Sequence, residues 1–134
     1  RSLAVAQPAP RPAPCRVSGR GRTFWHAPGE APEGPQEPGG HLLQILDETY
    51  RGYQDSRWVL DAAGDVPRTR ESATGMALVD GQLVASVRRT LGRDHVRFDL
   101  RPYRALTPAQ TEALGQAAGR YGEYLQLKAE ISLP

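Results

Sequence analysis

Arginines gather in one stretch of this chain, VRRTLGRDHVRFDLRPYR, which covers residues 87–104. A guanidinium group donates paired hydrogen bonds that match phosphate oxygens, and several on one surface release counterions when they bind a polyanion. The cationic face expected here carries no aromatic residue, so contacts to the backbone of duplex DNA are expected rather than base stacking or base readout. The candidate nucleic-acid-binding residues are Arg88, Arg93, Arg97, Arg101 and Arg104.

The distribution of charge supports this interpretation, although composition offers another one. Residues 76–104 carry six Arg against three Asp, whereas the whole chain has a net charge of only +2. A local excess of positive charge suits a polyanionic partner. The chain also has sixteen Arg and one Lys, with abundant Ala, Gly and Pro, which is typical of genomic base-composition bias. Exposed strand faces are normally charged, so a structural or protein-interaction surface without DNA affinity stays the alternative.

Acidic side chains are the second group that could do chemistry. Paired carboxylates act as general acids and bases or hold divalent cations. Their spacing here is irregular and no histidine accompanies them, so we expect structural ion pairs with Arg51 and Arg57, with an enzyme of its own as a third hypothesis. The carboxylates are Asp47, Glu48, Asp55 and Asp61.

Metal, cofactor and membrane chemistry find little support in the sequence. His26, His41 and His95 are too scattered for a metal-ligand signature, and His95 is expected to be an ordinary turn residue. Cys15 is the only cysteine, which excludes an internal disulfide and fits a reducing, cytoplasmic environment. No apolar run approaches the length of a membrane span. We therefore predict no metal, no cofactor and no membrane contact.

A β-hairpin is the clearest structural signal near the arginines. Residues 76–87 form two β-rich runs around Asp80-Gly81, a pair that suits a type I′ turn because both central residues need positive φ. A two-residue loop pairs Val79 with Gln82. The alternation then predicts one core face. Its members are Met76, Leu78, Leu83, Ala85 and Val87.

A second hairpin is expected to follow, with its turn at residues 92–95. Pairing Leu91 with Val96 places Arg88 opposite Asp99, a favourable cross-strand pair. Apolar residues then continue the core face, and the opposite face becomes polar and cationic. That second face contains Ser86, Arg88, Thr90, Arg97, Asp99 and Arg101.

A helix is predicted over residues 106–130. Thr107 suits the N-cap, Pro108 the first helical position and Gln110 a capping box. Apolar residues recur at intervals of three and four, and we expect this stripe to face the sheet. The stripe comprises Leu114, Ala117, Ala118, Tyr121, Tyr124, Leu125 and Lys128. The last residues, ISLP, are expected to add a short strand or tail.

Prolines divide the chain into regions. Eight of the twelve lie in the first forty residues, where they interrupt helices and sheets. We predict a flexible tail over residues 1–21, a short strand plus loop over 22–40 and a compact domain over 41–134, which includes a strand near 41–46. The predicted class is α+β: a small antiparallel sheet or partial barrel, built from two consecutive hairpins, packed against a C-terminal helix.

The order of these segments resembles the C-terminal part of the winged-helix DNA-binding family that includes the AlkZ-type DNA glycosylases. The similarity spans about residues 20–133. Its best segments are HLLQILDETYRGYQDS (41–56), LVDGQLVASVRRTL (78–91) and VRFDLRPYRALT (96–107). The family proline after HLL is replaced here by Gln44, and the family Gly-Thr-Trp by Ala85-Ser86-Val87, neither of which breaks the strand pattern.

The resemblance implies a DNA-associated domain that gives scaffold and phosphate contacts, beside a winged-helix region further upstream in the same protein. Glycosylase members carry a catalytic Gln-x-Gln motif near their N-terminus. No two glutamines in this chain stand two residues apart, so that motif cannot be transferred and no catalytic residue is assigned. The chain begins with Arg rather than Met, and we expect it to be the tail end of a longer protein.

Overall fold

The computed structural model describes residues 13–19, 21–29, 37–51, 56–67 and 74–134. The chain divides into two units, Arg1–Gly34 and Pro35–Pro134. The first unit contains a two-stranded antiparallel hairpin of β1 (Cys15–Gly19) and β2 (Arg22–His26). The predicted strand near residue 22 is confirmed, and β1 forms inside the region expected to be flexible chain. The apolar cross-strand pair of Val17 and Phe24 explains this pairing.

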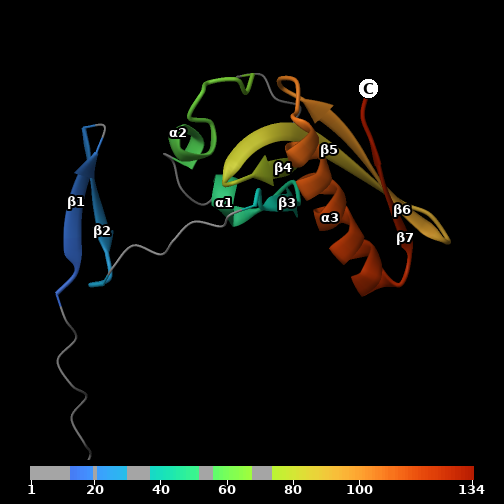
Figure 1. Ribbon diagram of the computed structural model, residues 1–134, viewed down its shortest axis with the longest axis horizontal. Coiled ribbons are helices and arrows are strands. Elements are labelled where there is room, and N and C mark those ends of the chain that lie inside the picture. Colours follow the sequence, from blue (N-terminus) through green and yellow to red (C-terminus); the bar gives the residue numbers. More distant parts are fainter. Residues whose placement is uncertain (1–12, 20, 30–36, 52–55, 68–73) are drawn as a thin grey trace, which may run out of the picture. The chain divides into compact units, whose positions relative to one another are not determined.

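The second unit is a five-stranded sheet with one long helix against it (Figure 1). The strand order is β3-β4-β5-β6-β7, and α3 packs mainly on β3 and β7. All neighbouring strands are antiparallel except β6 and β7, which are parallel. This architecture confirms the predicted α+β class. The elements are β3 (Gly40–Leu43), α1 (Glu48–Arg51), α2 (Ser56–Leu60), β4 (Gly75–Val79), β5 (Gln82–Leu91), β6 (His95–Pro102), α3 (Pro108–Leu125) and β7 (Lys128–Ser132).

The turn between β4 and β5 follows the sequence prediction. Asp80 and Gly81 have φ values of 50° and 71°, as a type I′ turn requires. Asp80 also accepts a hydrogen bond from the Gly39 N–H at 2.8 Å, which ties the turn to the start of β3. The predicted pairing of Val79 with Gln82 is confirmed. The second hairpin has the predicted register too, with Leu91 opposite Val96 and Arg88 opposite Asp99.

The predicted single core face of the first hairpin is wrong, because β5 contains a β-bulge. Leu78 pairs with Leu83 but Ala77 pairs with Ala85, so Val84 is an extra residue. One extra residue inverts the alternation of side chains along a strand. Met76, Leu78 and Leu83 therefore pack in one hydrophobic cluster with Leu60 and Val66. The other cluster lies on the α3 side and contains Ala77, Val79, Val84, Ala85, Val87, Val96, Phe98, Leu100, Leu114 and Ala118.

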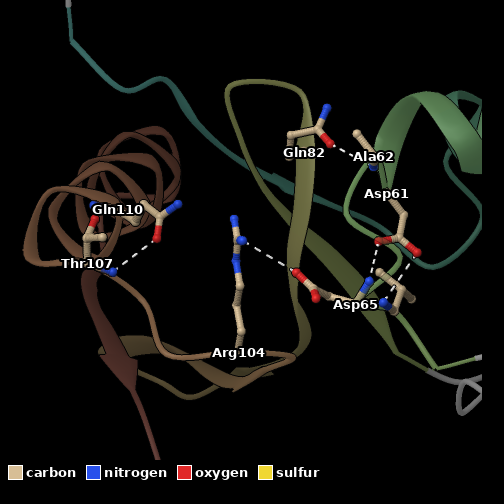
Figure 2. Close-up of polar contacts among 8 residues, drawn as sticks. Asp61, Ala62, Asp65, Gln82, Arg104, Thr107 and Gln110 are labelled. Atoms are coloured by element: carbon tan, nitrogen blue, oxygen red, sulfur yellow. Dashed lines mark hydrogen bonds and ion pairs between the residues drawn. The ribbon is translucent and has the colours of Figure 1, made fainter. Parts of the chain in front are cut away.

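Helix α3 begins as predicted and ends earlier. Thr107 accepts from the Gln110 N–H while the Gln110 side chain accepts from the Thr107 N–H, a complete capping box (Figure 2). Gln126, with φ of 58°, ends the helix in a left-handed conformation. The prediction that the helix continues to residue 130 is wrong, because α3 ends at Leu125 and residues 128–132 form the strand β7. A Cβ at Gly122 would lie 2.7 Å from the Leu127 carbonyl oxygen, so the chain turns back close to the helix.

The segment between β3 and β4 is tied to the hairpin by polar contacts. The predicted helical turn near Trp58 is confirmed as α2. The Gln82 side chain accepts from the Ala62 N–H at 3.0 Å (Figure 2). It also donates to the Val59 carbonyl at 2.9 Å. These bonds join the start of β5 to the end of α2 and the loop after it, next to Leu60 of the smaller hydrophobic cluster. Part of the predicted region of short strand plus loop over 22–40 lies outside the described residues, at 30–36, and so do residues 68–73 before β4.

Candidate nucleic-acid interface

The polar face of the β5–β6 hairpin carries the candidate interface. Ser86 and Arg88 of β5 lie opposite Arg101 and Asp99 of β6, with Arg97 two residues before Asp99. We call these five residues the arginine face. They line one shallow groove of about 310 Å³, together with residues of β7 and the chain end. The alternation expected from the sequence therefore brings three predicted arginines, at positions 88, 97 and 101, into one place.

The electrostatics of this face differ in one respect from expectation. Asp99 forms its ion pair with Arg97, at 3.1 Å between Nε and Oδ1, although its cross-strand neighbour is Arg88. In the described part of the chain Arg88 makes no ion pair. The Arg97 side chain is half exposed, so this contact stabilises the fold by at most about 1 kcal/mol. The arginine face itself contains three guanidinium groups and one carboxylate.

The other two predicted arginines lie apart from this groove. Arg93 is exposed in the turn between β5 and β6. Arg104 follows β6, and its guanidinium lies 3.5 Å from the Asp65 carboxylate, in the loop after α2 (Figure 2). The structure therefore gathers three of the five candidates and distributes the other two around them.

The β5–β6 turn contains the clearest local electrostatic effect. The His95 Nδ1 and Asp94 Oδ1 atoms lie 2.8 Å apart. This hydrogen bond is the main reason that the pKa of Asp94 lies below its usual value, with smaller contributions from the backbone and from the His95 charge. Both side chains of the pair are exposed to solvent, His95 by 43% and Asp94 by 90%.

A second groove, on the α3 side of the sheet, was not predicted. It has a volume of about 710 Å³ and lies between the end of β3, strand β5 and the second half of α3. Arg89 lies over the Tyr121 ring, 5.4 Å from its centroid, and donates a hydrogen bond to the Tyr121 hydroxyl. Phe98 meets the same ring edge-on at 5.6 Å. We call this cavity the α3 groove.

The rim of the α3 groove corrects one sequence prediction. Tyr124 was expected in the buried stripe of the helix, but its side chain is 82% exposed. The helix instead buries small residues, including Ala113 and Gly122, which lie nearer the sheet. Arg120, one turn before Tyr124, donates to the Gly40 carbonyl at 2.9 Å. The sequence contained one signal for this rim: Arg120 and Tyr124 stand at i and i+4, so they lie on the same side of a helix. That spacing identifies a groove only when the position of α3 beside β3 is known.

Two carboxylates of the acidic group, Asp47 and Asp61, accept hydrogen bonds from backbone N–H groups. Asp47 accepts from the Thr49 N–H at 2.9 Å and so caps α1. Asp61 accepts from the N–H groups of Asp65 and Val66 and shapes the loop after α2 (Figure 2). Asp55 and the side chains of Arg51 and Arg57 fall outside what is described. Within the described residues, no three His, Cys, Asp or Glu side chains come together as a metal site would require.

His26 and His41 lie in different parts of the structure. His26 contacts the neighbouring Ala27 carbonyl at 2.7 Å, and His41 lines the α3 groove. None of the described helices combines the length and apolar character needed to cross a bilayer. The second unit is thus a small α+β domain whose sheet carries arginines on one face.

Comparison with known proteins places this domain in a family. The chain matches the family described as DNA glycosylase AlkZ-like over residues 2–124. It therefore belongs to the AlkZ-like DNA glycosylase family, which confirms the resemblance to the AlkZ-type DNA glycosylases, whereas the winged-helix part of that expectation stays a prediction. No curated protein matched. Among solved structures, Streptomyces sahachiroi DNA glycosylase AlkZ is similar, with a TM-score of 0.48 and 14% identity over 90% of this chain. The chain spans about a third, 33%, of that protein's length.

Proposed function

We propose that this chain binds duplex DNA through the phosphate backbone, using the arginine face. The observation that supports this most is the placement of Arg88, Arg97 and Arg101 around one groove on adjacent strands. Arginine forks on a rigid sheet lose little conformational freedom when they bind phosphates. Arg93 and Arg104, on either side of this groove along the hairpin, would extend the contact to neighbouring phosphates.

A salt series tests this proposal. Binding of a fluorescein-labelled duplex is measured by anisotropy as the ionic strength rises. Each phosphate contact contributes about 0.9 to the slope of log affinity against log salt, so the three arginines of the arginine face predict a slope of about −2.7, and contacts from Arg93 and Arg104 would bring it to about −4.5. Arg88→Gln with Arg97→Gln should reduce the slope by about 1.8. Arg120→Gln, which removes the same kind of charge on the α3 side, is the matched control and should leave the slope unchanged.

We propose further that the chain is not catalytic alone and that it acts beside an upstream winged-helix region. The absence of a Gln-x-Gln pair in the sequence supports this, as do the backbone contacts of Asp47 and Asp61. An excess of this chain incubated with alkylated duplex DNA should release no base. Base release that is lost on replacing Asp61 with Asn would overturn the proposal.

A structural or protein-interaction module is the second candidate function. The Arg97–Asp99 and Arg104–Asp65 ion pairs favour it, because paired arginines are less available to phosphates. In that case the arginine face is a solvated surface, and the anisotropy experiment gives weak binding that neither salt nor the Arg88 and Arg97 substitutions change. The salt slope therefore decides between the two functions.

A further inference from the structure

The α3 groove has a lining unlike that of the arginine face. Its floor is apolar, formed in part by Val87, Phe98 and Ala117. Its rim carries two guanidinium groups, from Arg89 and Arg120. An apolar floor with a few placed charges is the usual composition of a small-ligand site, and about 710 Å³ lies within the range of about 300–1,000 Å³ for such sites.

The two arginines on the rim are held in place before any ligand arrives. Arg89 is fixed by the Tyr121 ring and hydroxyl, and Arg120 by the Gly40 carbonyl. Each contact uses one of the five N–H donors of a guanidinium group, so donors remain for an anion. Because their side chains are already ordered, these arginines lose little conformational entropy on binding. The rim therefore favours a ligand with a negatively charged group.

An exposed aromatic ring beside these charges narrows the ligand class. Tyr124 makes no hydrogen bond within the described part of the chain, and most of its ring surface faces solvent. It stands one helical turn after Arg120, on the same side of α3. Flat rings stack on exposed tyrosines and on guanidinium planes, and nucleobases do both. A base on Tyr124 would place its own phosphate near Arg120.

We propose that the α3 groove binds an unpaired nucleotide of single-stranded DNA, with the base against Tyr124 and Arg89 and the phosphate at Arg120. A base within a duplex cannot enter, because both of its faces are already stacked. The carboxylate among the described lining residues, Asp47, is held by the Thr49 N–H at the α1 end of the groove. An acidic peptide has charge to match the arginines but no ring to match Tyr124, so a nucleotide fits the lining better.

A fluorescent base tests this assignment in the intact chain. The probe is a thymidine oligonucleotide about 12 nucleotides long, within the usual site size of about 4–16, with one central 2-aminopurine. Stacking on tyrosine should quench the 2-aminopurine as wild-type chain is added. Tyr124→Ala should remove the quenching and weaken binding about 10-fold, whereas Tyr124→Phe should preserve both. Arg120→Gln should weaken binding and reduce the salt slope by about 0.7, the contribution of one single-strand phosphate.

The same variants separate this site from the arginine face. Arg88→Gln with Arg97→Gln should weaken duplex binding and leave 2-aminopurine quenching in place. Tyr124→Ala should remove 2-aminopurine quenching and leave duplex binding unchanged. If Tyr124→Ala leaves both quenching and affinity unchanged, the α3 groove does not hold the base. If single-strand binding is lost only with the Arg88 and Arg97 substitutions, the single strand runs over the arginine face and the assignment is overturned. Equal competition by a polyglutamate peptide, unaffected by Tyr124→Ala, would assign the groove to an acidic peptide instead.

Discussion

Replacing Gly40 with Ala probes how closely α3 packs against the edge strand β3. A Cβ at this position would lie 2.2 Å from the Ala113 carbonyl oxygen and 2.5 Å from its carbonyl carbon. Both are backbone atoms of α3, so no change of rotamer can make room. Because non-bonded heavy atoms prefer a separation of roughly 3.5 Å, the strand and the helix must move apart by about 1 Å.

This displacement has a cost that can be estimated. Overpacking a close contact destabilises a protein by about 1–3 kcal/mol. The movement also strains the 2.9 Å hydrogen bond from Arg120 to the Gly40 carbonyl, and a bond to a charged donor contributes about 1.5–3 kcal/mol when intact. With part of that bond lost, we expect Gly40→Ala to lower the free energy of unfolding by about 2–4 kcal/mol. In a domain of this size the melting temperature then falls by about 10 °C or more.

Urea unfolding followed by far-ultraviolet circular dichroism measures this loss. Gly119→Ala is the matched control, since it adds the same methyl group to α3 at a position with nothing within 4 Å of the new Cβ. There the better helix propensity of Ala should raise stability by about 1 kcal/mol. If Gly40→Ala unfolds within about 0.5 kcal/mol of wild type, the span expected for a neutral surface change, then α3 and β3 do not touch at this point.

Three further outcomes follow from local contacts. Thr107→Ala removes the capping box and should cost about 1 kcal/mol in thermal unfolding, with Thr107→Ser restoring most of it. Gln82→Ala should speed amide exchange at Ala62 while lowering global stability by no more than about 2 kcal/mol, because the lost bonds are partly exposed. The hydrogen bond with His95 is the main cause that holds the pKa of Asp94 below its usual value, so this carboxylate stabilises the folded state above the ordinary carboxylate pKa and loses its effect as the pH falls through the lowered pKa. Urea midpoints of wild type and Asp94→Asn should therefore differ at pH 6 and converge in strong acid; a constant difference would contradict the assignment.

Local sequence signals predicted much of the hairpin and helix start. Asp80-Gly81 specifies its turn by backbone conformation, and Thr107 with Gln110 specifies the helix start by side-chain hydrogen bonds. Such signals involve interactions within a few residues, so the turn and the helix start can be predicted without knowledge of the tertiary fold. The arginine face followed directly, because alternation along β6 from a known turn places Arg97 and Arg101 on one side.

Long-range features could not be read in the same way. The bulge at Val84 has no marker, since valine is an ordinary strand residue. The start of β7 could not be predicted, because Lys128 continues the helical spacing of the residues in α3. The helix ends at the left-handed backbone conformation of Gln126, which the sequence does not indicate. The α3 groove needs residues from β3, β5 and α3, such as Arg89 and Tyr124, whose proximity depends on how the helix crosses the sheet. Local patterns carry no information about that crossing.

The burial of β4 on both of its faces also affects how the domain unfolds. Strand β4 gives alternate residues to the two hydrophobic clusters, Ala77 to one and Leu78 to the other. A strand that belongs to both clusters cannot detach from one and stay in the other, so the two should lose their protection together. In hydrogen-exchange measurements the amides of these neighbouring residues should respond to denaturant as one cooperative unit, despite the separate environments of their side chains.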